Sequence, residues 1–304
     1  MTTTVGLDIG ATKILGVVVD GQGAILAQVR EETSPGADGV LSSAATVVER
    51  LQAASGEPLT GPVGVGIPGL VDVATGSVAH AVNLDLAGEP FPLAERLAER
   101  LGLSVAVDND LNAATLGAHV LSGVDDLVYL SLGTGLAAGL VLDGRIRRGA
   151  RGAAGEIGHI PVDPTGALCQ CGQRGCLETI ASGSAIAASW PSEGVPAAQA
   201  LFAAAASGTP AAVRVLDTFL RGVADAIRMI CLAVDPATVI LGGGVAALGE
   251  PLLAAVQGAL RQQAATSPFL AALDLAGRVR VVPADVPVAA LGAALLGTHL
   301  TGAH

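Results

Sequence analysis

Three of the four cysteines in this chain lie within eight residues, at Cys169, Cys171 and Cys176, and His159 lies ten residues upstream. Two glycines separate the second and third thiols, which allows the backbone to fold back so that the three sulfurs converge. Three thiolates and one imidazole form the ligand set of a closed tetrahedral zinc site. The alternatives are a chance cluster, or a disulfide with a spare thiol. The low cysteine content argues against chance and favours structural zinc.

Carboxylates flank this cluster. Glu156 precedes His159 by three residues, so the two side chains point the same way on a helical turn. Glu178 follows Cys176 by two residues. A structural metal at this place would hold polar side chains around a pocket. Hydrolysis on the metal itself is not expected, because four protein ligands leave no coordination position for water.

The composition excludes several classes of partner. The 304 residues suffice for two domains, and the formal net charge of -11 argues against nucleic acid and against an anionic membrane surface. The N-terminus lacks a signal-peptide pattern. The longest uncharged apolar stretch, residues 127–142, is broken by Gly and Thr and favours strands over a membrane helix. Clustered cysteines do not make a disulfide framework, so we expect a reducing, cytoplasmic setting.

The elements that must position the cluster begin with two similar hairpins, within residues 5–21 and 127–144. Each is an apolar strand, a glycine-containing turn, a second strand and an Asp-Gly turn. Four residue pairs match at one offset of 123 residues: Gly10 with Gly133, Gly16 with Gly139, Asp20 with Asp143, and Gly21 with Gly144. We interpret this as an internal duplication. Two such turns across a cleft would offer two sets of backbone N–H groups to one polyphosphate.

The rest of the chain alternates between segments with the pattern of strands and segments with the pattern of helices. Further strands are expected at 24–30, 63–67, 104–107, 238–241 and 279–282. Helices are expected at 37–54, 93–101, 112–121, 181–188, 197–207, 211–234, 251–264 and 288–296. Strands that alternate with helices predict mixed sheets covered by helices, an α/β fold.

These segments together resemble the ROK family of sugar kinases and repressors. The resemblance rests on residues 8–13, 68–69, 109–110, 133–135, 155–159, 169–178 and 242–244, in the order of the family and over nearly the whole chain. The zinc segment is the most specific of these motifs, and the glycine turns alone would be weak.

The resemblance implies a two-lobed actin/hexokinase-like (ribonuclease H-like) duplicated fold with the active-site cleft between the lobes. The small lobe would be residues 1–115, joined by a C-terminal helix at 288–304, and the large lobe with the zinc site would be residues 116–287. It also implies a homodimer or homotetramer. Family repressors carry a DNA-binding domain ahead of this fold, and none is expected here because Asp8 follows the start almost at once.

The implied activity is ATP-dependent phosphorylation of a hexose with Mg²⁺, with glucose as the favoured substrate and glucose 6-phosphate as the product. N-acetylglucosamine, N-acetylmannosamine and fructose are alternative substrates, and a non-catalytic sugar sensor is an alternative function. Asp110 is the expected general base, since a carboxylate at a strand end can accept the proton of a sugar hydroxyl. Asp108 and Asp110 lie on either side of Asn109, so the sequence alone does not decide which of them is the base. Only the match to the family's Asn-Asp pair favours Asp110. Without that match, a polar turn or a helix N-cap would explain these residues equally well.

The resemblance assigns the remaining roles. The expected sugar ligands are Gly69, Asn83, Asn109, Glu156, His159 and Glu178. The expected nucleotide-binding residues are Asp8, Gly10, Thr12, Lys13, Gly133, Thr134, Gly135, Gly243 and Gly244.

Within the nucleotide set, Asp8 would help to hold Mg²⁺, and Lys13, the one lysine of the chain, would contact phosphate. Gly243 and Gly244 would let the adenosine approach the backbone. The chain has Ala11, Ala137 and Ala138 where the family usually or often has Gly. These methyl groups leave open whether ATP or another phosphoryl donor is preferred.

Overall fold

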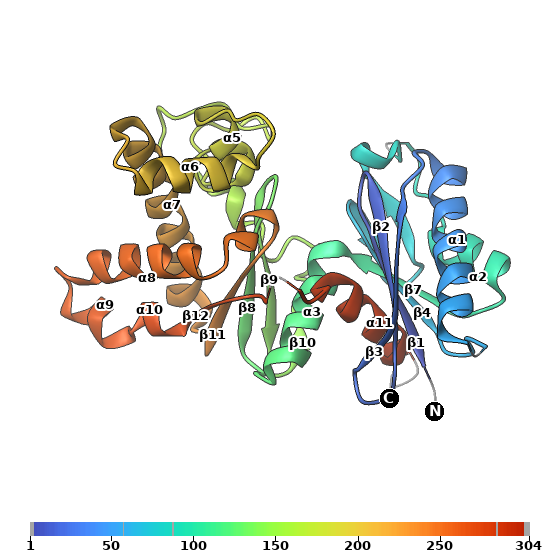
Figure 1. The fold of residues 1–304 in the computed structure, drawn as a ribbon. Coiled ribbons are helices and arrows are strands. Elements are labelled where there is room, and N and C mark those ends of the chain that lie inside the picture. The colour runs from blue at the N-terminus through green and yellow to red at the C-terminus, as the bar shows by residue number, and fades with distance from the viewer. Residues whose placement is uncertain (1–2, 57, 87, 284, 301–304) are drawn as a thin grey trace. The chain divides into compact units, whose positions relative to one another are not determined.

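The computed structural model describes residues 3–56, 58–86, 88–283 and 285–300. Within these ranges the chain divides into two compact units (Figure 1). Unit 1 runs to Gly123 and adds residues 150–152 and the segment from Pro287 onward, and unit 2 comprises Val124–Gly149 and Ala153–Val286. Each unit contains one five-stranded sheet, and the two sheets have equivalent strand orders. The α/β fold and its duplication are therefore confirmed.

The sheet of unit 1 has the order β3-β2-β1-β4-β7. Its strands are β1 (Thr4–Ile9), β2 (Lys13–Val19), β3 (Ile25–Glu32), β4 (Val63–Ile67) and β7 (Val105–Asn109). The first three strands are antiparallel neighbours, whereas β1, β4 and β7 run parallel. Strand β4 is buried at all five positions, because helices cover both faces of this sheet.

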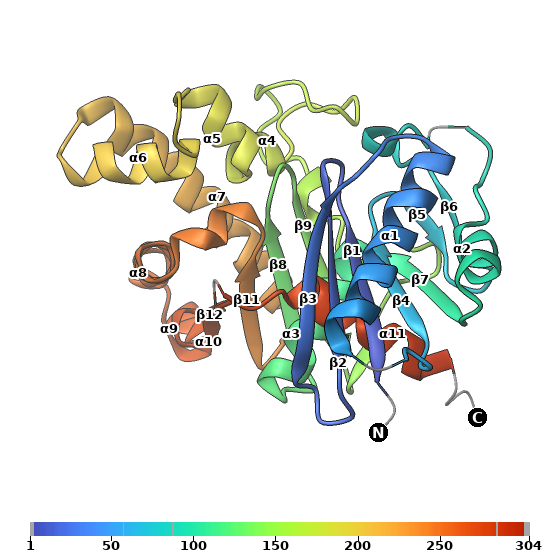
Figure 2. The ribbon, with the colours of Figure 1, turned by 45° about the vertical axis from the view of Figure 1, so that its right-hand side comes forward.

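Helices α1 (Ala37–Ser55) and α2 (Leu93–Leu101) pack on one side of this sheet, and α3 (Asp110–Ser122) and α11 (Val288–Leu300) pack on the other (Figures 1 and 2). Helix α11 lies unusually close to the strands. A Cβ atom at Gly6 of β1 would lie 1.9 Å from the carbonyl oxygen of Ala290, and one at Gly64 of β4 would lie 1.7 Å from that of Ala293. Glycine is required at both positions to admit the helix backbone.

Unit 2 repeats the sheet in the order β10-β9-β8-β11-β12. Its strands are β8 (Leu127–Leu132), β9 (Leu136–Leu142), β10 (Arg145–Ile146), β11 (Thr238–Gly242) and β12 (Val279–Val281). The helices are α4 (Glu178–Ala181), α5 (Gly183–Ser189), α6 (Ala197–Ala206), α7 (Pro210–Val234), α8 (Glu250–Ala264), α9 (Pro268–Leu273) and α10 (Leu275–Arg278). Side chains of the strands, α7 and α8 form one core, built mainly from aliphatic residues and including the fully buried Phe219. No helix in the described ranges is both long enough and apolar enough to cross a membrane.

The strands of the two hairpins correspond at the offset of 123 residues. Residues 4–9 of β1 and 13–19 of β2 map onto 127–132 of β8 and 136–142 of β9 without adjustment at either end. The pairing register nevertheless differs by one residue. Leu7 pairs with Gly16, whereas Gly139, the counterpart of Gly16, pairs with Tyr129. The second turn is therefore one residue tighter than the first.

Three local features differ from the sequence-based expectation. Strand β7 continues through Asn109, and α3 begins at Asp110 because the Asn109 side chain accepts a hydrogen bond from the amide of Leu111. The single helix expected at 181–188 is instead α4 and α5, separated at Ser182, whose hydroxyl caps α5 by accepting from the amide of Ala185. The ribbon of β5 (Leu70–Asp72) and β6 (Ser77–Ala79) and the short helices α9 and α10 were not expected.

Candidate functional site

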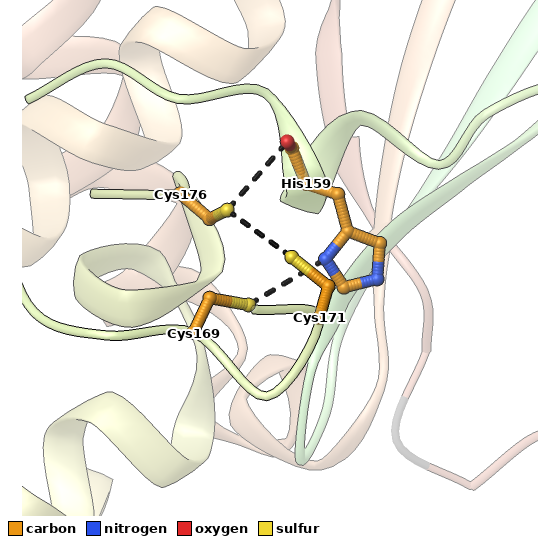
Figure 3. A group of neighbouring side chains, drawn as sticks. All are labelled: His159, Cys169, Cys171 and Cys176. Atoms are coloured by element: carbon orange, nitrogen blue, oxygen red, sulfur yellow. Dashed lines mark hydrogen bonds between the residues drawn. The ribbon is translucent and has the colours of Figure 1, made fainter. Parts of the chain in front are cut away.

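The residues His159, Cys169, Cys171 and Cys176, here called the metal cluster, converge in unit 2 (Figure 3). Their ligand atoms all lie within 4.8 Å of one another. The sulfur of Cys169 lies 3.7 Å from Nδ1 of His159, and the sulfurs of Cys171 and Cys176 are 3.6 Å apart. Tetrahedral zinc would space two sulfurs by about 3.8 Å and a sulfur and a nitrogen by about 3.6 Å. The donor set and its spacing fit zinc.

The loop around the metal cluster is organised to hold these ligands. Pro161 pairs with Cys176 across an isolated bridge, which joins the segment that carries His159 to the segment that carries the thiols. The side-chain amide of Gln173 donates to the carbonyl oxygen of His159 at 3.1 Å and to the sulfur of Cys171 at 3.4 Å. This amide lowers the pKa of the Cys171 thiol to about 6, which favours the thiolate that a metal requires. Gln173 was not among the expected site residues.

Glu156 and Glu178 approach the two nitrogens of the His159 ring. Nε2 lies 3.8 Å from Oε2 of Glu156, and Nδ1 lies 3.7 Å from Oε1 of Glu178. Glu156 is 55% exposed, whereas Glu178 is 21% exposed. Oε1 of Glu178 also accepts from the thiol of Cys169 at 3.3 Å, and Oε2 accepts from the amide of Leu136 at 3.4 Å. Two expected sugar ligands, Glu156 and Glu178, thus lie beside the metal cluster, and the third, His159, belongs to it.

Three carboxylates of unit 1, those of Asp8, Asp108 and Asp110, lie at the ends of β1 and β7. Asp108 is buried, and its Oδ1 accepts from the Asn109 amide at 2.7 Å and from Nδ2 of Asn112 at 2.8 Å. These contacts give Asp108 a structural role. Burial raises the pKa of Asp110, and the amide of Leu111 opposes that rise. Burial, and next the negative charge of Asp110, raise the pKa of Asp8 to about 6, although the charge of Lys13 lowers it.

Asn109 connects the end of β7 to the turn that follows β4. Its Nδ2 donates to the carbonyl oxygen of Gly69 at 3.1 Å. Gly69 has φ +112°, and a Cβ there would lie 2.7 Å from the carbonyl oxygen of Ala79 and 3.1 Å from Cβ of Ala81. Asn83 is exposed in the 3₁₀ turn Val82–Leu84 that follows Ala81. Asn109 and Gly69 are therefore in direct contact, and Asn83 belongs to the neighbouring turn.

The two glycine turns use their first amides internally. The Gly10 amide donates to the carbonyl of Lys13 at 2.9 Å, and the Gly133 amide donates to that of Gly135 at 3.1 Å. Within the described part of the chain, the amides of residues 11, 12, 134 and 135 donate to no protein acceptor. These amides, more than those of the first glycines, can donate to an anion. Thr12 and Lys13 are exposed beside the first of these turns.

The alanines at positions 11, 137 and 138, where the resemblance leads to an expectation of glycine, cause no backbone strain. Ala11, Ala137 and Ala138 are all absent from the non-glycine residues with positive φ among those described. Ala11 is exposed in the first turn, and the other two lie within β9, where Ala138 is fully buried in the core. Alanine is therefore compatible with the backbone conformation at all three positions.

The two glycines that follow β11, Gly243 and Gly244, serve different purposes. Gly243 has φ +79°, and a Cβ there would lie 2.7 Å from the carbonyl carbon of Leu132 and 2.9 Å from the amide nitrogen of Gly133. Gly243 thus allows this loop to pack on the backbone of the second glycine turn. Gly244, which begins the 3₁₀ turn Gly244–Leu248, has open space in the direction of a Cβ. Of the two, Gly244 is the position that leaves room for a ligand.

The expected site residues fall into two groups by unit. Unit 1 holds Asp8, Gly10, Thr12, Lys13, Gly69, Asn83, Asn109 and Asp110. Unit 2 holds Gly133, Thr134, Gly135, Glu156, His159, Glu178, Gly243, Gly244 and the cysteines of the metal cluster. Each group contains candidates for both sugar and nucleotide.

Comparison with known proteins places the chain in a family. A model of the ROK family matches residues 4–297. The glucokinase of Halalkalibacterium halodurans is 35% identical over 274 residues, 82% of either chain, and the N-acetylmannosamine kinase of Citrobacter koseri is 34% identical over 272 residues, 86% of this chain and 90% of that one. The crystal structure of a ROK family glucokinase from Streptomyces griseus in complex with glucose and AMPPNP superimposes with a TM-score of 0.79 and 32% identity, and covers 98% of this chain and 99% of that one. The actin/hexokinase-like fold is confirmed by these neighbours.

Proposed function

We propose that this chain, which belongs to the ROK family, is an ATP-dependent sugar kinase whose favoured acceptor is glucose. Its similarity to glucokinases, over more than four fifths of the sequence, supports this activity. The similarity to a structure that contains both glucose and an ATP analogue supports the pairing of sugar and nucleotide.

The observation that carries the proposal is the environment of Asp110. This carboxylate begins α3 directly after β7, and burial raises its pKa above the ordinary value near 3.8. A raised pKa makes the ionised carboxylate a better proton acceptor. In the proposed reaction, the sugar hydroxyl oxygen forms a bond to the γ-phosphorus as the bond to the ADP oxygen breaks. The hydroxyl proton moves to a carboxylate oxygen of Asp110.

The sugar would be held by groups that both donate and accept hydrogen bonds. In this proposal the sugar contacts come from Asn109, Asn83, the backbone at Gly69, Glu156, His159 and Glu178. Carboxylate, amide and imidazole groups suit a ring that carries several hydroxyls. Zinc in the metal cluster would fix the His159 ring through Nδ1 and leave Nε2 free to face Glu156 or a ligand.

The nucleotide would be held by the two glycine turns. The amides of Thr12, Thr134 and Gly135 would donate to phosphate oxygens, Lys13 would add a positive charge, and Gly244 would admit the adenosine. Asp8 is the proposed partner for Mg²⁺, since a half-buried carboxylate with a like charge nearby is the kind of oxygen ligand that this ion prefers. When bound, Mg²⁺ would neutralise charge on the transferred phosphoryl group.

N-acetylmannosamine is the second candidate substrate, because a kinase for that sugar is 34% identical to this chain. An ADP-release assay with ATP and Mg²⁺ across glucose, mannose, fructose, N-acetylglucosamine and N-acetylmannosamine tests both candidates. We expect the largest kcat/KM with glucose. If kcat/KM is instead largest with N-acetylmannosamine, that sugar replaces glucose as the proposed acceptor. Absence of turnover with every sugar, on folded and zinc-loaded protein, would contradict the kinase.

The Asp110→Asn variant tests the base. We expect kcat to fall by about 10²–10⁴-fold, while the exposed Asp72→Asn variant in the same unit keeps its activity. Because the base must be ionised, kcat of the wild type should fall as the pH drops through the raised pKa of Asp110. Full activity in Asp110→Asn would exclude it as the base.

Oligomeric state and location complete the proposal. The family resemblance favours a homodimer or homotetramer, and the clustered thiols favour the reducing cytoplasm. Light scattering on the purified chain measures the first, and a monomer over the working concentration range would contradict it.

A further inference from the structure

We propose that the metal cluster controls the phosphate turn, defined as Gly133–Gly135, and thereby the affinity of unit 2 for nucleotide phosphates even when no sugar is bound. This inference rests on the proposed function, because it takes the phosphate turn as a phosphate-binding element. The contacts that carry it all lie within unit 2, between the turn and the two segments that supply the metal ligands.

The segment that carries His159 lies against the strand that leaves the turn. The carbonyl of Gly155 accepts from the amide of Ala138 at 2.8 Å. Gly155 has φ +92°, and a Cβ there would lie 1.7 Å from the carbonyl oxygen of Ala138. A Cβ at Gly158 would lie 2.0 Å from that of Leu136. Backbone therefore touches backbone from the residue before His159 to the start of β9, and a displacement of His159 must be transmitted to β9.

The segment that follows Cys176 contacts the turn itself. Oε2 of Glu178 accepts from the amide of Leu136, and a Cβ at Gly135 would lie 2.7 Å from the same oxygen. The amide of Gly183 donates to the carbonyl of Gly133 at 2.7 Å, and the hydroxyl of Ser184 donates to that of Thr134 at 2.6 Å. This segment thus holds two carbonyls of the turn and the first amide after it.

The metal joins these two segments. Without it, they are connected near the cluster by the pair Pro161 and Cys176, by the bond from the Leu177 amide to the Ile160 carbonyl, and by the Gln173 side chain. A metal bound to His159 and to the three thiolates adds four strong bonds at the same place. It would therefore close both segments on the phosphate turn.

A turn that is held in its binding geometry loses less conformational freedom when the ligand binds. The carbonyl contacts fix the peptide planes whose amides, at Thr134 and Gly135, are available to phosphate oxygens. Loss of the metal should free these planes and weaken binding of ligands that reach them. A nucleotide without a β-phosphate has fewer contacts with the turn and should be affected less.

The test compares zinc-loaded and metal-free full-length protein without sugar. We expect the Kd for ADP to rise at least about tenfold on metal removal, and the Kd for AMP to change less than twofold. Equal ADP affinity in the two forms would overturn the inference. So would an equal loss for ADP and AMP, because that pattern indicates a general loss of structure.

Hydrogen exchange gives a readout that requires no nucleotide. The amides of Leu136 and Gly183 should exchange faster in the metal-free protein than in the loaded protein. Unchanged exchange at both amides would overturn the inference. If loaded protein binds neither nucleotide, the proposed function fails, and the exchange rates alone decide the inference.

A variant that keeps every metal ligand tests the same link in loaded protein. Ser184→Ala removes the donor to the Thr134 carbonyl and should weaken ADP binding about three- to tenfold, with zinc content unchanged. The matched control is Ser207→Ala, whose hydroxyl donates to the carbonyl of Ala204 at the end of α6. Wild-type ADP affinity in Ser184→Ala would refute the role of the Ser184 contact.

Discussion

Replacing Asp8 with asparagine should stabilise the protein at pH 8 and do so much less at pH 4.5. Burial and the charge of Asp110 raise the pKa of the Asp8 carboxyl to about 6 in the folded protein, from an ordinary value of 3.8. The ionised form is therefore disfavoured by folding. This cost is absent below the unfolded pKa, grows between pH 3.8 and about 6, and is complete above pH 6.

The size of the effect follows from the two pKa values. At about 1.4 kcal/mol per pKa unit, ionised Asp8 costs about 3 kcal/mol of stability at pH 8. At pH 4.5 most of the folded protein carries a protonated Asp8, and the same linkage leaves about 1 kcal/mol. Asparagine has nearly the same shape and no charge, so the variant should gain these amounts. The same change should lower turnover, because Asp8 is the proposed Mg²⁺ partner.

Urea unfolding of wild type and variant at both pH values, without Mg²⁺ or nucleotide, measures the gain. Asp72→Asn, on the exposed β5–β6 ribbon of the same unit, controls for removal of one negative charge from a chain with net charge -11. An equal gain at pH 8 and pH 4.5 would trace the effect to packing. No gain at pH 8 would refute the reasoning outright.

Three further changes test other parts of the structure. Metal analysis should find one zinc ion per chain, and the Cys176→Ser variant should lose this ion. The control is Cys231→Ser, which should keep the zinc. The Cys231 thiol is buried in α7, and its pKa is raised to about 11. Gly243→Ala should lower the free energy of unfolding in urea by about 1–3 kcal/mol and weaken ADP binding. The reason is that φ is +79° and the added methyl group would meet the backbone of the phosphate turn. Wild-type stability of this variant would contradict that packing. Gly64→Ala should lower stability by about 3 kcal/mol or more, since its methyl would overlap α11. The control is Gly258→Ala inside α8, where a Cβ would meet open space, and this change should be neutral or stabilising by up to about 1 kcal/mol. Similar changes in stability for Gly64→Ala and Gly258→Ala would contradict the close packing of α11 on the sheet.

The strands and long helices could be predicted because their signals are local. The apolar alternation of β1 and β2, and its recurrence 123 residues later, requires no knowledge of the partner strands. The choice between Asp108 and Asp110 could not be made that way. It depends on β7 running on to pair Asn109 with Ile67, which buries Asp108 and places Asp110 at the start of α3.

The links within the candidate site were also beyond a local pattern. The spacing to Cys176 along the chain could place Glu178 beside the metal cluster, and the family resemblance implied its role as a sugar ligand. Its contact with Leu136, 42 residues away, exists only once β9 and α4 are packed. The same holds for Gly243: a glycine triplet after a strand indicates close approach of something, and only the fold shows that the backbone of residues 132–133 fills that role.

The close packing of α11 against glycine residues also affects the order in which the two units can fold during protein synthesis. Beyond Gly6 and Gly64, the helix meets α3 where a Cβ at Gly117 would lie 2.1 Å from the Val288 carbonyl oxygen, and one at Gly292 would lie 1.8 Å from that of Ala113. Unit 1 therefore stays incomplete while the ribosome makes residues 124–286. Unit 2 requires no segment beyond Val286, so its core can form before α11 completes unit 1.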